Sequence, residues 1–239
     1  MAITAAVSLS SAAGDLVSSA LTISTSTALT KAGLSTALAN TSGLAKKTTT
    51  TTSEYTLFYA DDYTDSKAHK LYIKNTSATP ADFFTLSNGD EVLGRMYAGD
   101  WALIPWAAVN GTPATFTIAV SVASAADDWA TGDTLTFDGT TITQGATETI
   151  VAMQALIAAG NYTNWTAAAT SSSLTTFTAK RSDYFGAIEA GVASDAWVES
   201  SSDGVHTVAS VTAAVASAND IKITPGQAAN TIEYMLFHE

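Results

Sequence analysis

The sequence predicts a mainly β protein: a β-sandwich or barrel-like core, an inserted α+β module of ββαββ order, and an extended N-terminal arm. Two observations favour this fold class. Short runs rich in β-branched and aromatic residues follow one another between residues 70 and 106, and turn-forming residues such as Asn88 and Gly89 close them. The motif Glu-Tyr-x-Leu-Phe occurs at 54–58 and again at 233–237, so we expect the last strand to close the first domain.

Residues 1–53 form the predicted arm and linker. They are rich in Ala, Ser and Thr and contain no aromatic residue, so they cannot build a core of their own. Two interpretations stay open: a disordered tail, or an arm that becomes ordered against neighbouring subunits. Residues 5–20 fit a short helix, the alternation from residue 21 fits a strand, and 46–52 are typical of an extended linker. The branched side chains that such an arm would bury against a partner are Leu16, Leu21, Ile23 and Leu29.

The predicted core domain consists of residues 54–111 and 218–239. Residues 70–74 alternate between polar and branched apolar side chains, as in a strand with one buried face. Successive short strands and turns from there onward predict a β-meander. Trp101 and Trp106 occupy an apolar run, and we expect both side chains to fill the core.

Residues 112–217 are predicted to form the inserted domain. A helix is expected from Thr147, which can cap it, to residue 159, because Ile150, Met153 and Ile157 recur at helical spacing. It should bury these three residues against a small sheet. The strands are expected at 115–122, in a hairpin over 133–143, and at 162–170 and 174–180, and residues 206–216 are expected to lead back to the core domain.

The charge pattern narrows the classes of partner. Only 13% of residues are charged, against roughly 25% in ordinary soluble domains. Such low charge favours a subunit that buries surface in an assembly, and we expect a homo-oligomer. The net charge is −12, and no Lys or Arg lies between residues 113 and 179, so direct binding of nucleic acid is not expected. The apolar runs are too short to predict a membrane span.

Motifs for catalysis are not found in the sequence. His69, His206 and His238 are far apart, there is no cysteine, and no nucleophile elbow or phosphate-binding loop is present. We therefore expect no enzyme, no metal and no cofactor. Trp129 and Trp197 lie among small and polar residues, which makes them candidates for contact with a partner, including a sugar.

Several of these runs carry a resemblance. The segments 70–106, in particular 94–101, and the closing segment 220–234 resemble small virion structural proteins of tailed bacteriophages, notably those of marine and cyanobacterial phages. The insert, from the run at 132–139 onward, is similar to an add-on module of phage tail and surface proteins. The resemblance covers about two thirds of the chain and brings no catalytic residues.

The resemblance implies a non-enzymatic role on the surface of a phage particle. The leading hypothesis is a head decoration, or cement, protein whose arm joins adjacent capsomers, with the major capsid protein and other virion subunits as partners. Two alternatives stay open: a tail tube or tail fibre subunit, and a carbohydrate-binding adhesin module.

Overall fold

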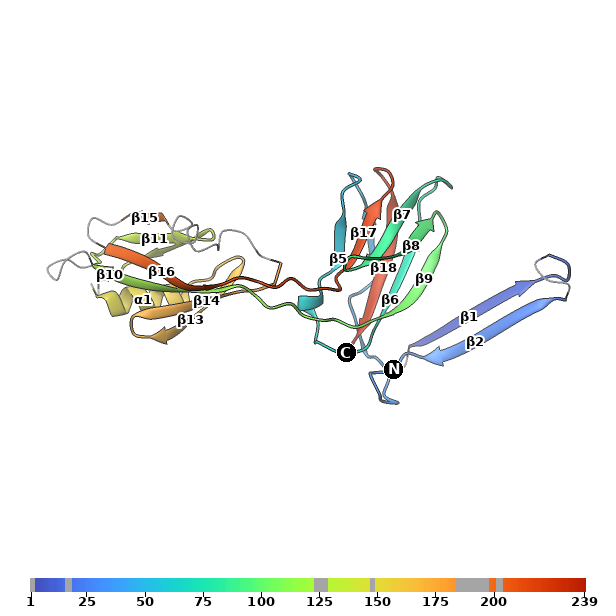
Figure 1. Cartoon of the computed structure of the whole chain (residues 1–239), viewed down its shortest axis with the longest axis horizontal. Helices are drawn as coiled ribbons and strands as arrows, with labels where there is room; N and C mark the ends of the chain where they lie inside the picture. Colours follow the sequence, from blue (N-terminus) through green and yellow to red (C-terminus); the bar gives the residue numbers. More distant parts are fainter. Residues whose placement is uncertain (1–2, 16–18, 123–128, 147–148, 184–197, 201–203) are drawn as a thin grey trace. The chain divides into compact units, whose positions relative to one another are not determined.

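The computed structural model describes residues 3–15, 19–122, 129–146, 149–183, 198–200 and 204–239. The protein is mainly β, which confirms the predicted fold class, and the described residues include a single α-helix (Figure 1). The chain divides into two compact units, Met1–Val109 together with Ala218–Glu239, and Asn110–Ser217. The first unit thus includes the residues that we expected to form a separate arm.

Two antiparallel sheets of the first unit enclose one core. We call them sheet A and sheet B, and Figure 1 shows their strands facing each other. In order, sheet A consists of β5 (Tyr55–Phe58), β17 (Ile221–Pro225), β7 (Phe83–Asn88) and β8 (Glu91–Tyr97). Sheet B consists of β3 (Asn40–Thr41) and β4 (Ala45–Thr48) side by side with β18 (Thr231–His238), then β6 (His69–Asn75) and β9 (Trp101–Trp106).

The sandwich core is made of branched and aromatic residues that alternate along these strands. Leu71 and Ile73 of sheet B and Phe84 of sheet A have no exposed surface and belong to the same buried cluster. The two Glu-Tyr-x-Leu-Phe runs lie on opposite sheets of this unit. The Phe58 and Tyr234 rings meet edge to face, with centroids 5.6 Å apart, so the two runs join the sheets through their aromatic residues.

The predicted β-meander is wrong, because the chain crosses between the sheets after β6 and again after β8. β6 pairs with β9 and β18, whereas β7 pairs with β8 and β17. The buried side chain of Asn75 holds the first crossing. Its Nδ2 donates to the carbonyls of Asp82 at 3.1 Å and Met96 at 2.9 Å, and its Oδ1 accepts from the Ser77 N–H at 3.0 Å.

The predicted linker at 46–52 is also wrong in part, because β4 is an edge strand of sheet B. Its residues pair with the first half of β18, and the Thr49 N–H continues the pattern by donating to the Asn230 carbonyl at 2.9 Å. These bonds satisfy backbone groups of β18 that would otherwise lie at an open edge. Within the predicted arm and linker, β3 and β4 thus belong to sheet B, and the residues before β3 do not.

The N-terminal residues form a two-stranded antiparallel ribbon, β1 (Thr4–Ser11) with β2 (Leu21–Ala28). The short helix expected over 5–20 is thus wrong for the described residues, since β1 occupies much of that range. Leu29 closes the base of the ribbon: its N–H donates to the Ile3 carbonyl, and its carbonyl accepts from the Leu38 N–H, both at 2.8 Å. Both leucines are buried, so the base is packed although the ribbon is not.

The second unit contains two sheets and the helix. In order, the larger sheet consists of β13 (Trp165–Ser171), β14 (Leu174–Ala179), β10 (Thr115–Val122) and β16 (Gly204–Thr212). The smaller sheet consists of β12 (Thr140–Thr143), β11 (Thr134–Phe137) and β15 (Val198–Ser200). We expected residues 206–216 only to lead back to the first unit. Instead, β16 pairs along β10 as a strand of this sheet. The stacked rings of Phe116 and Phe177, 4.8 Å apart, lie in the core.

The helix α1 (Ile150–Ala159) is capped at its N-terminus by Thr149, whose hydroxyl accepts from the Ala152 N–H at 3.1 Å. The expected cap, Thr147, lies outside the described residues. Met153 and Ile157 are fully buried, as the helical spacing predicted, whereas Ile150 is only half-buried. The helix ends at Gly160, where a Cβ would come within 2.7 Å of the Tyr162 ring, so this glycine permits a close approach.

Gln154 on the same helix completes the hydrogen bonds of β10. Its Oε1 accepts from the Val120 N–H and its Nε2 donates to the Ile118 carbonyl, both at 3.2 Å. The side-chain amide thereby bonds backbone groups of β10 beyond the stretch in which β14 pairs with β10. The apolar spacing that predicted the helix gave no indication of this role.

Candidate functional site

The ribbon β1–β2 has one apolar face. In an antiparallel pair, residues directly opposite each other share a face, and here Leu9 lies opposite Ile23 and Val7 opposite Thr25. The neighbouring positions, such as Ser8 and Ser24, form the other face. Leu9 is 55% and Ile23 is 48% exposed, which is high for branched aliphatic side chains in strands. The ribbon is therefore amphipathic, and beyond its half-buried base its apolar face is left exposed at Leu9 and Ile23.

The ribbon also carries no charge. Neither β1 nor β2 contains an acidic or basic residue, in a chain with 22 acidic and 10 basic residues. An isolated two-stranded ribbon is marginally stable in water, because it buries little apolar surface. These strands are therefore suited to gaining stability from contact with another surface.

A second apolar surface lies on the outside of sheet B. Tyr72 on β6 points away from the core, and its cross-strand neighbours are Leu103 on β9 and Met235 on β18. Trp101 is two positions from Leu103 and Phe237 two positions from Met235, so both lie on the same face of sheet B as Tyr72. We call these five residues the outer face.

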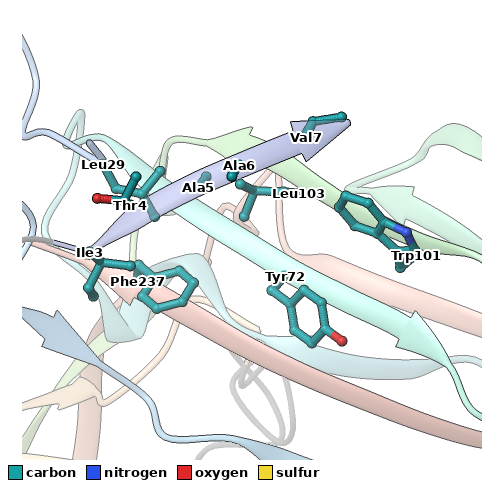
Figure 2. A pocket seen from close by; sticks show the side chains of 10 residues that line it. All are labelled: Ile3, Thr4, Ala5, Ala6, Val7, Leu29, Tyr72, Trp101, Leu103 and Phe237. Atoms are coloured by element: carbon teal, nitrogen blue, oxygen red, sulfur yellow. The ribbon is translucent and has the colours of Figure 1, made fainter. Parts of the chain in front are cut away.

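A groove of about 200 Å³ lies between this outer face and the base of the ribbon (Figure 2). Figure 2 shows Ile3 beside Phe237 at one end, and Val7 and Trp101 toward the other. The ribbon side of the groove is lined by Ile3, Thr4, Ala5, Ala6, Val7 and Leu29, and the sheet side by Tyr72, Trp101, Leu103 and Phe237.

Trp101 lies outside the core, so our expectation that its side chain fills the core is wrong. The side chain is 51% exposed, whereas Trp106 is buried and donates from its indole N–H to the Asn219 carbonyl at 2.8 Å. The two tryptophans are five residues apart, so the two-residue period of a strand places them on opposite faces. That alternation was visible in the sequence and could have placed Trp101 on the outer face.

Charged residues frame the outer face. Glu233 lies between Lys46 and Lys74 across three neighbouring strands, and Lys70 follows on the same side of β6. The Tyr72 hydroxyl donates to Glu233 Oε1 at 3.1 Å. Partial burial, together with this hydrogen bond, raises the pKa of Tyr72. The outer face is thus an apolar band with a basic rim in a chain that is acidic as a whole.

Glu239 ties the base of the ribbon to sheet B. Its Oε1 accepts from the Ala32 N–H at 2.6 Å and from the Ala68 N–H at 3.3 Å. The bond from Ala32 is the main reason that the pKa of this carboxyl is lowered. One carboxylate therefore contacts both the segment that follows β2 and the segment that precedes β6.

The other partner-contact candidates have different fates. Leu21 is half-buried in the ribbon. Leu29 is buried at the ribbon base by residues of its own chain, so it is not exposed to a partner. Trp129 is a correction: it has no exposed surface, and its indole N–H donates to the Ser121 carbonyl at 3.0 Å, so it is a core residue of the second unit. Leu16 and Trp197 lie outside the described residues.

Clusters of metal ligands and membrane-spanning helices are both absent from the part of the chain that the structure describes. No three His, Asp or Glu side chains gather there as metal ligands. No helix there has the length and hydropathy to cross a bilayer. No family model matches the chain, and no curated protein sequence matches it at a significant level.

Proposed function

We propose that this chain is a non-enzymatic structural protein of a tailed-phage virion, and that it serves as a head decoration, or cement, protein. In this role the sandwich sits on the particle surface, and the ribbon joins it to neighbouring virion subunits, among them the major capsid protein. The observation that carries the proposal is the uncharged ribbon with its exposed apolar face, extending from a well-packed sandwich.

The energetics of the ribbon support an attachment role. Its exposed leucine and isoleucine contribute favourable free energy only when another surface covers them, at roughly 25 cal/mol per Å² of apolar area buried. A single contact of this size is weak. On a lattice, however, many copies are held at once, and modest contacts add up to strong retention.

The direct test is deletion of residues 1–28, which removes the ribbon and leaves β3 and β4 in sheet B. We expect the truncated protein to fold with an unchanged melting temperature for its sandwich and to be lost from particles that retain the full chain. The measurement is co-sedimentation with particles that lack the protein, with the full chain as control. Equal binding of the truncated form would contradict the proposal, and the attachment surface would then lie on the sandwich.

Location within the particle separates the head role from the tail alternative. Antibody against this chain, viewed on intact particles by negative-stain electron microscopy, is expected to label the head. Label confined to the tail would instead favour a tail tube or fibre subunit.

A further inference from the structure

We propose that the ribbon of one copy docks on the outer face of sheet B of a second copy, with Leu9 and Ile23 lying against Trp101. The inference deepens the proposed function and rests on its assignment of the ribbon as an attachment arm. It names the partner of that arm: another copy of this same chain.

The size and chemistry of the groove favour a protein side chain as its occupant. At about 200 Å³ it is smaller than the roughly 300 Å³ at which small-molecule sites begin. The sheet side of the groove is aromatic and aliphatic, and Trp101 at its edge is half exposed. One branched side chain from an extended strand matches such a groove, and tryptophan is among the residue types enriched at the centres of protein interfaces.

Charge favours a second copy. Two chains of net charge −12 repel each other unless the surfaces that meet are free of acidic excess. The ribbon strands are uncharged, and the outer face has Lys46, Lys70 and Lys74 around it against Glu233. This pair of surfaces therefore brings two acidic molecules together with little repulsion, and both surfaces belong to the same chain.

The sandwich edges argue for docking on a face rather than for addition of a strand. β5 has four residues, and β8 bulges at Leu93, where the register against Leu86 and Ser87 shifts. β9 contains Pro105, which has no N–H to offer, and the edge formed by β3 and β4 is interrupted at Gly43. These are the means by which proteins protect sheet edges from further pairing. The outer face has none of these features, and the base of the chain's own ribbon lines only one side of its groove.

The interface has a consequence for assembly. The ribbon and the outer face are different surfaces, so the contact is head to tail: in a pair, one copy keeps a free ribbon and the other keeps a free outer face. Such contacts close into rings or continue as chains of subunits. This is the pattern needed to join neighbouring positions on a particle.

The test uses three variants of the full-length chain. The ribbon variant is Leu9→Ser with Ile23→Ser, and the face variant is Trp101→Ser. The matched control, Ser10→Thr with Thr22→Ser, changes the polar face of the same strands. All of the altered residues lie on the surface or on the ribbon, so we expect each variant to keep the melting temperature of the parent chain.

Mass is measured by sedimentation velocity over a concentration series. We expect the parent chain and the control to grow beyond a monomer as concentration rises. The ribbon and face variants should each weaken association by roughly thirtyfold or more, as for an interface hot spot. An equimolar mixture of the two variants should form a dimer and stop there, because only one intact ribbon and one intact outer face can meet.

Any one of the following results would overturn the inference. A parent chain that stays monomeric at every concentration has no such contact. A face variant that associates as the parent does places the contact elsewhere, as does a mixture that fails to form the dimer. A ribbon variant that alone loses association points to pairing of ribbon with ribbon. Because no particle takes part, the outcome is independent of the co-sedimentation result, so failure of the inference and failure of the proposed function are told apart.

Discussion

The sandwich and the ribbon are built from similar alternating strands, yet they use their apolar residues in opposite ways. Ile73 on β6 has no exposed surface, whereas Ile23 on β2 is 48% exposed. Both occupy an alternating run in an antiparallel strand. The difference is that β6 faces a second sheet across the sandwich core, whereas no described sheet covers Ile23 on β2. Alternation defines which face of a strand is apolar, but only a facing sheet turns that face into a core.

The largest expected effect comes from the same substitution made in both places. Ile73→Asp would bury an unpaired charge in the sandwich and should cost more than about 4 kcal/mol of the free energy of unfolding. Ile23→Asp leaves its carboxylate in water and should change that free energy by no more than about 0.5 kcal/mol. Urea unfolding followed by circular dichroism measures both. Similar losses for the two variants would remove the distinction between core and ribbon.

A smaller loss of stability is expected at Asn75, whose side chain bonds backbone carbonyls where the chain crosses between the sheets. Asn75→Ala leaves the buried Met96 carbonyl without its donor and should cost about 1–3 kcal/mol. The matched change on the ribbon, Ser8→Ala, removes an exposed hydroxyl and should be neutral. The melting temperatures of the two variants, compared with that of the parent chain, decide the point. An unchanged value for Asn75→Ala would show that water satisfies the carbonyl instead.

A pH-dependent effect should be confined to the sandwich. Burial first, and then the neighbouring His238, lowers the pKa of His69 from its ordinary value of 6.5, while Glu239 and a backbone contact oppose the shift. The folded state therefore holds this ring neutral, whereas the unfolded chain takes up the proton as the pH falls through 6.5. Stability from this group is full above that pH and declines below it.

The measurement is the melting temperature from about pH 8 to about pH 5. The parent chain should lose stability on the acid side, and His69→Phe should flatten that dependence. The ribbon contains no histidine, so deletion of residues 1–28 should leave the dependence as it is. A slope that His69→Phe does not change would assign the effect to another group.

The smallest effect concerns an ion pair on the surface of sheet A. Lys222 Nζ lies 3.3 Å from Glu54 Oε1, and the Glu54 side chain is half exposed. Solvent screens such a pair, so Glu54→Gln should change the free energy of unfolding by less than about 0.5 kcal/mol. Urea unfolding at low and high salt checks this expectation. A loss above 1 kcal/mol, present only at low salt, would contradict it.

Local periodicity explains what the sequence predicted well. The mainly β class follows from short runs with a two-residue period, and residues 70–74 show that period most clearly. The helix follows from the spacing of Met153 and Ile157, both of which are buried. These features depend on neighbours within a few positions, so they can be recognised without knowledge of the rest of the chain.

Features that depend on distant partners could not be predicted in this way. β6 pairs with β18, about 160 residues further along, and no turn between residues 70 and 106 indicates the crossing between sheets. β4 has the composition of a linker and becomes a strand only because β18 needs a partner. Trp129 has neighbours typical of a loop, yet the core of the second unit encloses it.

The candidate site was predicted only in part for a related reason. Ile23 was predicted as a partner-contact residue from its alternation, and the structure shows its side chain 48% exposed. Trp101 was placed in the core because its neighbours are apolar, although counting positions from Trp106 would have placed it outside. The outer face also draws Phe237 from the other end of the sequence, and only the folded sheet brings these residues together.

The junction of the two units suggests a use for this protein as a scaffold. On the side of the second unit, Thr112 and Val215 exchange two backbone hydrogen bonds of 2.8 Å. On the side of the first, Asn219 Oδ1 accepts from the Val109 N–H at 2.9 Å. Each unit thus fastens the outgoing and returning segments together by itself. For the folding of the sandwich, Asn110–Ser217 is equivalent to a loop whose two ends are held together. The length of such a loop adds little to the entropic cost of closing it. A foreign domain with adjacent termini, such as a fluorescent reporter, should therefore be tolerated in its place.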